Sequence, residues 1–334
     1  MLHCSIDLDA DGLQIGYLKL IHSDDRYSCS TIPVPIISMK NGSGPTVLLT
    51  AGVHGDEYAG IAALRRFVAC QDVKKINGHM IILPTTNYPA FCAVSRVSPL
   101  DQMNLNRIFP GAPDGSPTEQ IANYIDNQLL PKVDFALDFH TGASQSDWLP
   151  CTFVYGIKNN LMQAKVDAVN CFGTEYSMVI PGGGSPGSLL SACERHNIPS
   201  FSTEIRGGAT LHASAYHIAL SGLYRTLKLW GVLDAIPVEE HTTNTSFMQF
   251  QKIESLMAPI DGMIVPEYNL GADVKAGELA ARIYPIDDLS RAPIDIKYDC
   301  DGVVSMCSTS TLKKRGDYIC NVAQEIDISK YRQN

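Results

Sequence analysis

Three side chains in two short segments could together hold a metal ion. His54 and Glu57 follow an apolar run that ends near Ala51, and His140 ends a second apolar run that begins at Asp134. Two imidazoles and a carboxylate form a three-ligand set for zinc. Such a set leaves a fourth position open for water, which a hydrolytic site needs. We therefore predict one catalytic zinc ion per chain.

Each half of this pattern has a simpler interpretation when it stands alone. The spacing His-x-x-Glu is common, and a histidine at the end of a strand is often a hydrogen-bonded structural residue. However, His54 and His140 both follow runs typical of buried strands. Ligands in open α/β sheets bind outside the carboxyl ends of the strands, where both segments would end. The joint placement favours a metal site.

Strand and helix patterns alternate between residues 45 and 235. The predicted strands cover residues 46–52, 80–84, 135–140, 153–155 and 199–205, and the predicted helices cover 57–69, 119–130, 188–196 and 215–233. This alternation predicts an α/β fold with a mainly parallel or mixed sheet flanked by helices. Residues 1–42 carry alternating patterns and turns, which indicates a strand extension at the edge of a catalytic domain over residues 1–237.

Beyond Pro237 the pattern changes, and an internal repeat appears. Residues 261–279 give a strand, a glycine turn and a strand, and residues 301–319 repeat this order. Two such halves predict an all-β, barrel-sandwich-like domain over residues 247–334, similar to biotinyl and lipoyl domains. Those domains carry their cofactor on a lysine between the halves, whereas residues 285–291 contain none. We expect a structural module that shapes the cleft or an oligomer contact, so a homo-oligomer is one expectation.

Composition limits the classes of function. A formal net charge of −9 argues against nucleic-acid binding, which needs basic clusters. The ten cysteines form no CxxC pair, which indicates reduced and mostly buried thiols in a cytoplasmic setting. No stretch approaches the length of a membrane span, and the first residues lack the features of an export signal. We therefore expect neither a membrane partner nor export.

Asn106 and Arg107 are candidates for substrate binding. They lie in a segment with weak helix signals, and an arginine on a loop can hold a carboxylate through two parallel hydrogen bonds. The adjacent asparagine would add a neutral donor. Arg96 could make a second anion contact or polarise the scissile carbonyl. The alternative is that these arginines simply lie at the surface.

Glu204 stands near the end of an apolar strand, where an unpaired carboxylate is costly unless it has a function. Beside a metal-bound water it would act as general base and then as proton donor to the leaving amine. A salt bridge with Arg206 is the alternative. Asp138, on the same strand face as His140, could orient a zinc-bound imidazole or be a buried structural residue. The glycine-rich residues 181–187 lack the lysine of a P-loop, which favours a loop beside the active site over a phosphate cradle.

Taken in order, these residues resemble the succinylglutamate desuccinylase/aspartoacylase family, a branch of the zinc carboxypeptidase-like superfamily. The resemblance rests on six positions and covers residues 45–235 in detail: His54, Glu57, Asn106, Arg107, His140 and Glu204. The segment from Arg96 to Gly111 is similar to a bacterial subgroup that includes N-acetyl-diaminobutyrate deacetylases of ectoine breakdown. Aspartoacylase-like enzymes have a further arginine shortly before the Asn-Arg pair, and Arg96 is the nearest match at a longer spacing.

The resemblance implies a zinc-dependent hydrolase acting on linear amides. It would cleave a small N-acyl amino acid and release a carboxylate and a free amine. His54, Glu57 and His140 would bind zinc, Glu204 would be the catalytic carboxylate, and Asn106 and Arg107 would hold a substrate carboxylate. Two alternatives remain open: a zinc carboxypeptidase acting on peptides, and a non-enzymatic binding protein of the same fold.

Overall fold

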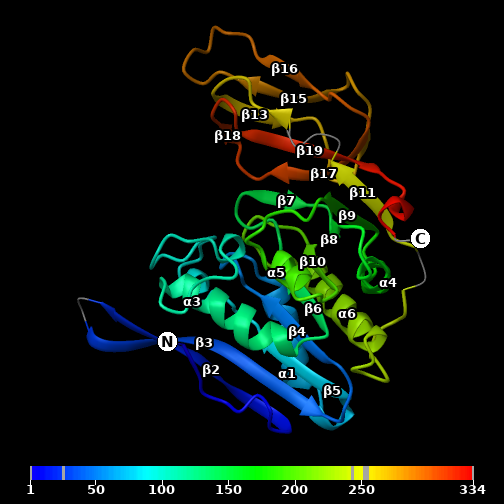
Figure 1. Cartoon of the computed structure of the whole chain (residues 1–334). Coiled ribbons are helices and arrows are strands. Elements are labelled where there is room, and N and C mark those ends of the chain that lie inside the picture. Colours follow the sequence, from blue (N-terminus) through cyan, green and yellow to red (C-terminus); the bar gives the residue numbers. More distant parts are fainter. Residues whose placement is uncertain (1, 25–26, 242–243, 251–255, 333–334) are drawn as a thin grey trace.

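The computed structural model describes residues 2–24, 27–241, 244–250 and 256–332. Within these ranges the strands form a 15-stranded mixed sheet and a separate four-stranded antiparallel sheet. The large sheet runs through the whole molecule, and the small sheet lies at the end opposite the N-terminal strands (Figure 1). None of the helices in the described part of the chain is both long and apolar enough to cross a bilayer.

The central strands of the large sheet lead to the candidate site. Their spatial order is β5 (Gly78–Leu83), β4 (Thr46–Ala51), β6 (Phe135–Phe139), β10 (Ser200–Glu204), β8 (Cys151–Gly156) and β9 (Tyr176–Pro181). Strands β5, β4, β6 and β10 are parallel, whereas β8 is antiparallel to β10 and β9 is parallel to β8. The carboxyl ends of β4, β6 and β10 therefore lie side by side. This arrangement brings together the segments that carry His54, His140 and Glu204.

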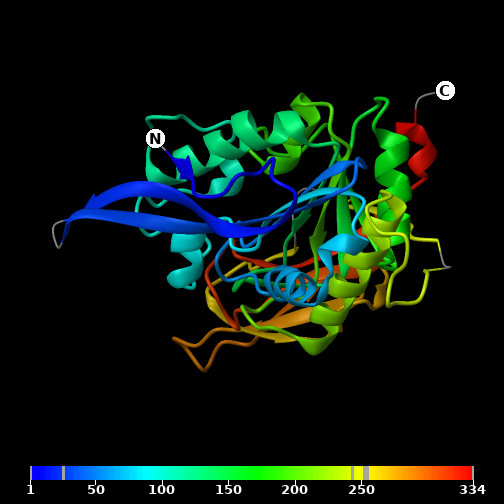
Figure 2. The ribbon, with the colours of Figure 1, turned by 90° about the horizontal axis from the view of Figure 1, so that it is seen from below.

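Helices cover both faces of these strands (Figure 2). One face packs against α1 (Ala59–Cys70), α4 (Met162–Phe172) and α6 (Ala213–Leu229), and the other against α3 (Pro117–Tyr124) and α5 (Leu189–Arg195). Leu48 and Leu49 are both fully buried but belong to different hydrophobic clusters. A strand with both faces buried needs no polar alternation, which explains the continuous apolar run of β4. The predicted α/β class is confirmed.

Three shorter helical segments connect these elements: α2 (Tyr88–Cys92), a 3₁₀ turn at Val73–Lys75 and another at Leu105–Arg107. The predicted helix over residues 119–130 is α3 followed by a wider π turn (Ile125–Leu129) and a 3₁₀ turn (Leu130–Lys132). A last 3₁₀ turn covers Ile328–Tyr331.

At one edge, β1 (His3–Cys4), β2 (Gly12–Asp24) and β3 (Tyr27–Asn41) form an antiparallel extension, and β3 pairs with β5. The β2–β3 hairpin projects away from the body of the molecule (Figure 1). The strands expected in residues 1–42 are thus present, at the expected edge of the sheet.

At the other edge, β9 pairs with β11, and the large sheet continues into the C-terminal region. Its remaining strands are β11 (Ser246–Phe250), β19 (Tyr318–Glu325), β17 (Gly302–Ser308) and β14 (Asp273–Val274), with β12 (Leu256–Met257) beside β19 and β7 (Ser146–Trp148) beside β17. The separation into domains at residues 237 and 247 stays a prediction, because the sheet crosses that boundary.

The four-stranded sheet has the order β16 (Ile294–Lys297), β15 (Leu279–Tyr284), β13 (Gly262–Pro266) and β18 (Leu312–Lys313). The two repeat halves interleave, because β14 of the first half pairs with β17 of the second, and β18 of the second pairs with β13 of the first. A separate hydrophobic cluster, which includes Ala280, Ile283 and Ile319, lies between the sheets. This is the sandwich that the repeat predicted.

Helix α4, whose N-cap is Leu161, and strand β9 were not among the predicted elements. One expectation needs correction. The cysteines are not mostly buried: only Cys151, Cys193 and Cys320 are buried, whereas Cys29, Cys70 and Cys92 are exposed. Cysteine type alone does not fix burial, because the small thiol is tolerated both in a core and at a surface.

His79 on β5 couples folding stability to pH. The imidazole is buried, and its Nε2 lies 2.8 Å from the Oγ of Ser38 on β3. Burial, and then the charge of Lys40, lower the pKa of His79 from 6.5 to about 4. Between these two values the unfolded chain binds a proton that the folded chain excludes. The free energy of unfolding therefore falls as the pH is lowered through this window.

We expect His79→Gln to be less sensitive to acid than the wild type. Glutamine keeps a polar group near Ser38 but does not titrate. The variant should therefore lack the fall in the free energy of unfolding that acid causes in the wild type, which is at most about 3 kcal/mol across the window. Urea unfolding at both ends of the window measures the effect. His217→Gln, at an exposed position of α6, is the control. An equal fall in stability in His79→Gln and wild type would contradict this assignment.

Candidate metal centre and active site

The predicted ligands His54, Glu57 and His140 form one buried cluster. The Nδ1 atom of His54 lies 2.7 Å from Oε1 of Glu57, and the Nδ1 atom of His140 lies 2.9 Å from Oε2 of the same carboxylate. Ligand atoms from the three residues all lie within 4.8 Å of one another. The backbone N–H of Thr141 also donates to Oε2 of Glu57 at 3.0 Å. The carboxylate is therefore fixed between the two imidazoles.

Neighbouring polar groups hold both imidazoles in orientation through their Nε2 atoms. His140 Nε2 lies 2.7 Å from Oδ2 of Asp138, and Thr50 on β4 donates to the other oxygen of Asp138 at 2.7 Å. His54 Nε2 lies 3.1 Å from Oδ1 of Asn104. With both Nε2 atoms engaged, both Nδ1 atoms face Glu57. This is the outer-shell pattern that orients zinc-bound histidines in proteins.

The electrostatics of the cluster follow from burial and close contacts. Burial lowers the pKa of His54, against the opposing effect of Glu57. Burial alone would raise the pKa of Glu57, but the charges and hydrogen bonds of His54 and His140 hold it well below its usual range. For His140, the effect of Asp138 and Glu57 outweighs that of burial, so its pKa lies well above the usual value. The negative charges of Glu57 and Asp138 are thus balanced by the nitrogen atoms of His54 and His140.

The cluster fits a zinc ion. Zinc prefers imidazole nitrogen and carboxylate oxygen, and three protein ligands are typical of a catalytic site. His54, Glu57 and His140 offer this donor set, with ligand atoms close enough to surround one ion. His140 also has the carboxylate partner, Asp138, that stabilises a bound imidazole.

A cavity of about 220 Å³ opens directly above the cluster. Its walls include all the predicted site residues except the buried Glu57: His54, Arg96, Asn106, Arg107, His140 and Glu204. The structure therefore brings the predicted site residues to one place. Arg96 bridges the cavity and the cluster, since its Nη1 lies 3.3 Å from His54 Nδ1 and 3.5 Å from Glu57 Oε1.

The Asn106–Arg107 pair is held by the 3₁₀ turn at Leu105–Arg107. Asn104 caps this turn by accepting a hydrogen bond from the Asn106 N–H at 2.9 Å, with the same oxygen that contacts His54. Asn106 Oδ1 accepts from the backbone N–H of Leu189, at the start of α5, at 2.9 Å. The amide NH₂ of Asn106 must then point the other way, and it lies 3.4 Å from His140 Nε2. Asn106 thus presents a donor to the site.

Arg107 is exposed and contacts no carboxylate within the described residues. Its Nη1 donates to the backbone carbonyl of Asn106 at 2.7 Å. Burial, and then the neighbouring charge of Arg96, lower the pKa of the Arg107 guanidinium. Two guanidinium groups at one small cavity, one without a carboxylate partner, create a strong preference for an anion.

Glu204 is the last residue of β10 and lines the same cavity. Its Oε2 atom is buried and has no hydrogen-bond partner in the described part of the chain. Burial, and then the negative charge of Glu57, raise the pKa of Glu204 well above its usual value. The alternative of a salt bridge with Arg206 is wrong, because Arg206 pairs with Asp147 at 2.7 Å. An unpaired carboxylate facing the metal cluster is suited to proton transfer.

The glycine-rich loop over residues 181–187 lies beside the site, as expected. Gly184 and Ser185 line the cavity. Gly187 approaches the Asn106–Arg107 turn so closely that a Cβ atom there would lie 2.0 Å from the carbonyl oxygen of Arg107. The Phe109 N–H donates to the Gly187 carbonyl at 3.0 Å. Glycine is therefore required for the contact between the two loops.

The sequence did not identify several other residues of the site. Asn104 and Thr50 orient the ligands, while Tyr155 and Ser188 line the cavity and join through a 2.7 Å hydrogen bond. The N-x-N-R spacing was a usable signal for Asn104. Thr50 could be found only from the strand register, in which it lies opposite Asp138.

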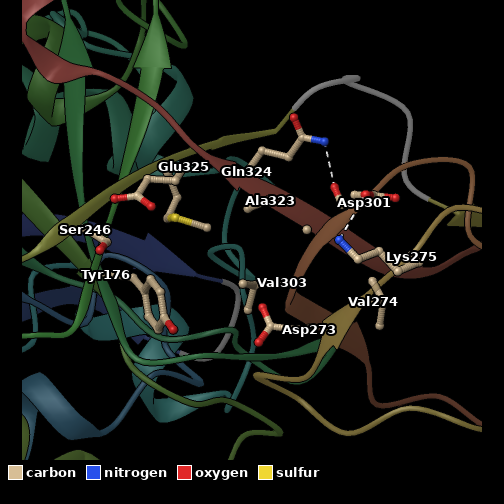
Figure 3. A pocket seen from close by; sticks show the side chains of 12 residues that line it. Tyr176, Ser246, Asp273, Val274, Lys275, Asp301, Val303, Ala323, Gln324 and Glu325 are labelled. Atoms are coloured by element: carbon tan, nitrogen blue, oxygen red, sulfur yellow. Dashed lines mark hydrogen bonds and ion pairs between the residues drawn. The ribbon is translucent and has the colours of Figure 1, made fainter.

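A larger cavity of about 610 Å³ lies at the junction of β9 and β11 with the C-terminal strands (Figure 3). Its walls carry Asp273, Asp301 and Glu325, and Lys275 lies 3.1 Å from Asp301. None of the predicted site residues lines it. Size alone therefore does not identify the active site.

Comparison with known proteins agrees with this geometry. The model of the succinylglutamate desuccinylase/aspartoacylase catalytic domain matches residues 43–230. The chain belongs to this family. Among its relatives, the N-alpha-acetyl-L-2,4-diaminobutyric acid deacetylase of Halomonas elongata is 31% identical over 331 residues, which cover 98% of this chain and 96% of the relative.

Solved structures of other family members superpose over nearly the whole chain. A succinylglutamate desuccinylase from a Silicibacter species gives a TM-score of 0.92 at 33% identity, covering 97% of this chain and 98% of that one. The product-bound ectoine utilization protein EutE of Ruegeria pomeroyi gives a TM-score of 0.91 at 36% identity, with the same coverage. The similarity to the family therefore includes the C-terminal sheets as well as the catalytic half.

Proposed function

We propose that this protein is a zinc-dependent amidohydrolase that cleaves the amide bond of a small N-acyl amino acid. One observation carries the proposal: a His-Glu-His cluster, an unpaired carboxylate and two arginines meet at one cavity of about 220 Å³. A cavity of this size suits a small acylated amino acid better than an extended peptide. Zinc held by His54, Glu57 and His140 would polarise the amide carbonyl and make water a stronger nucleophile.

Glu204 is the proton-transfer group in this proposal. As a carboxylate it takes a proton from the attacking water, and it then gives that proton to the amide nitrogen as the carbon–nitrogen bond breaks. Its place at the cavity, with no partner on Oε2 in the described part of the chain, leaves it available for both transfers. The neighbouring Arg96 stabilises the negative charge that develops on the carbonyl oxygen.

Asn106 and Arg107 hold the carboxylate of the amino-acid half. Arg107 offers a planar pair of donors without a competing carboxylate, and Asn106 adds an amide donor whose direction is fixed by Leu189. The Halomonas relative is a deacetylase of an N-acetylated diamino acid, and N-acetyl-diaminobutyrate is therefore the first substrate to test.

The test is a panel of N-acetyl, N-succinyl and N-formyl amino acids, with detection of the released amine. Zinc content by elemental analysis and a matched set of peptides complete the experiment. Turnover of N-acyl amino acids supports the proposal, and preference for peptides would make the protein a carboxypeptidase. Binding without turnover, in a chain loaded with zinc, would indicate a binding protein.

Arg107→Lys should lower kcat/KM by about ten- to a hundredfold, or roughly 1.5–3 kcal/mol. Lysine keeps the charge but loses the planar fork that grips a carboxylate. Steady-state kinetics with each substrate and its carboxamide analogue measure the effect. Wild type should strongly prefer the free carboxylate, and the variant should lose most of this preference.

Arg65→Lys, at an exposed position of α1, is the matched control and should behave like the wild type. Equal discrimination between carboxylate and carboxamide by wild type and Arg107→Lys would show that the carboxylate is bound elsewhere. Arg96 would then be the first candidate, since it lines the same cavity.

A further inference from the structure

The loops that follow His140 and Glu204 are joined to each other by backbone hydrogen bonds. The Gly142 N–H donates to the Arg206 carbonyl at 2.7 Å, and the Ala209 N–H donates to the Ala143 carbonyl at 2.8 Å. A Cβ atom at Gly207 would lie 1.9 Å from the carbonyl oxygen of Ser146, so the two loops are in close contact. The ends of β6 and β10 are therefore tied together just beyond the site.

The loop after His140 continues into a strand that pairs with the C-terminal part of the large sheet. After residue 145 the chain forms β7, which pairs with β17 so that Asp147 lies opposite Cys307. Thr309, just after β17, adds two contacts to the loop: its Oγ1 donates to the Ser144 carbonyl at 2.6 Å, and its N–H donates to the Gln145 carbonyl at 3.2 Å. The loop that follows His140 is thus anchored to the C-terminal region.

Arg206 connects the second loop to this strand through its side chain. Its guanidinium lies 2.7 Å from Oδ2 of Asp147, and the two side chains are only 33% and 20% exposed. Arg206 has a φ of 62°, in the left-handed region that disfavours residues other than glycine. Strain of this kind persists where surrounding contacts require it, and it gathers near functional sites. Arg206 follows Glu204 by two residues, with Ile205 between them.

We propose that the Arg206–Asp147 ion pair positions Glu204 by fastening the end of β10 to β7, and through β7 to β17 of the C-terminal region. Arg206 and Asp147 are positioning residues that act through the backbone, and they do not touch the substrate. The C-terminal region then has a defined task in catalysis, which is to hold the general base at the correct place. The inference rests on the proposed function, because it assigns the pair a role through Glu204.

Asp147→Asn and Arg206→Gly test the ion pair by different routes. Both remove the charge pair, but glycine also relieves the left-handed strain, so Arg206→Gly should keep its Tm. We expect both variants to lose about ten- to a hundredfold in kcat, as small misplacements of catalytic groups do, with little change in KM or zinc content. The conservative Asp147→Glu should recover most of the loss.

Glu240→Gln is the matched control, because it breaks the exposed Lys228–Glu240 pair, which lies 2.6 Å apart on the outside of α6. It should leave kcat unchanged. Wild-type kcat in Arg206→Gly, or a loss of zinc that parallels the loss of activity in Asp147→Asn, would overturn the positioning role.

Amide hydrogen exchange separates this inference from the proposed function. In Asp147→Asn, exchange should become faster in residues 203–209 and stay unchanged in β4, whatever reaction the protein catalyses. If the wild type turns over no N-acyl amino acid, the proposed function fails, and faster exchange would still show that the pair fastens the end of β10. If the wild type is active and exchange in residues 203–209 is unchanged, the positioning role is wrong.

Discussion

Glu204→Gln should lose about 10²–10⁴ in turnover while keeping its zinc and its affinity for substrate. The amide has nearly the shape of the carboxylate but can neither accept a proton from water nor deliver one to the leaving nitrogen. Glu204 lines the cavity that the metal cluster shares, and among the described residues no other carboxylate lines it. Single-turnover kinetics, substrate binding by calorimetry and elemental analysis would measure the three quantities separately.

The control for this variant is Glu239→Gln, which changes an exposed glutamate away from the cavity and should be fully active. Near-normal turnover in Glu204→Gln would remove Glu204 from the mechanism. A parallel loss of zinc would instead assign Glu204 to the metal site.

His54→Ala should abolish both tight zinc binding and activity in a chain that remains folded. The imidazole provides one of three ligands, and alanine leaves Glu57 and His140 unable to complete a stable site. Asp138→Asn provides a graded comparison, because loss of an outer-shell carboxylate weakens metal binding by about 10–100-fold. Elemental analysis after dialysis and competition with a chromogenic chelator give the affinities.

Far-UV circular dichroism of His54→Ala should match that of the wild type, and His217→Ala controls for the loss of a histidine at an exposed position. Stoichiometric zinc in His54→Ala would show that His54 is not a ligand. An activity loss with unchanged zinc would give His54 a role in substrate binding.

The sequence predicted the strand–turn units of the site because their signals are local. β4 and β6 are largely apolar, and a histidine follows each strand within three residues, so the elements and the ligands were visible together. The role of Glu204 followed from the cost of an unpaired carboxylate in an apolar strand. For Asp138 the shared strand face suggested contact with His140 but left a buried structural role open, and the structure shows the contact.

Contacts that depend on the register of distant segments were not predictable in the same way. Thr50 reaches Asp138 only because β4 and β6 align these two positions, and Asn104 reaches His54 only because the 3₁₀ turn folds over the site. Helix α4 was not predicted, although Gly173 marks its end with a φ of 86°. The Arg206–Asp147 pair depends on β7 pairing with β17, a strand that comes much later in the chain.

Strand β9 of the catalytic half has β8 on one side and β11 on the other. A chain that stopped before β11 would leave the backbone donors and acceptors along β9 without partners, beside the buried side chains of Met178 and Val179. An unpaired apolar edge of this kind is a template for aggregation. Pairing with β11 therefore removes a strand edge at which the catalytic half could self-associate.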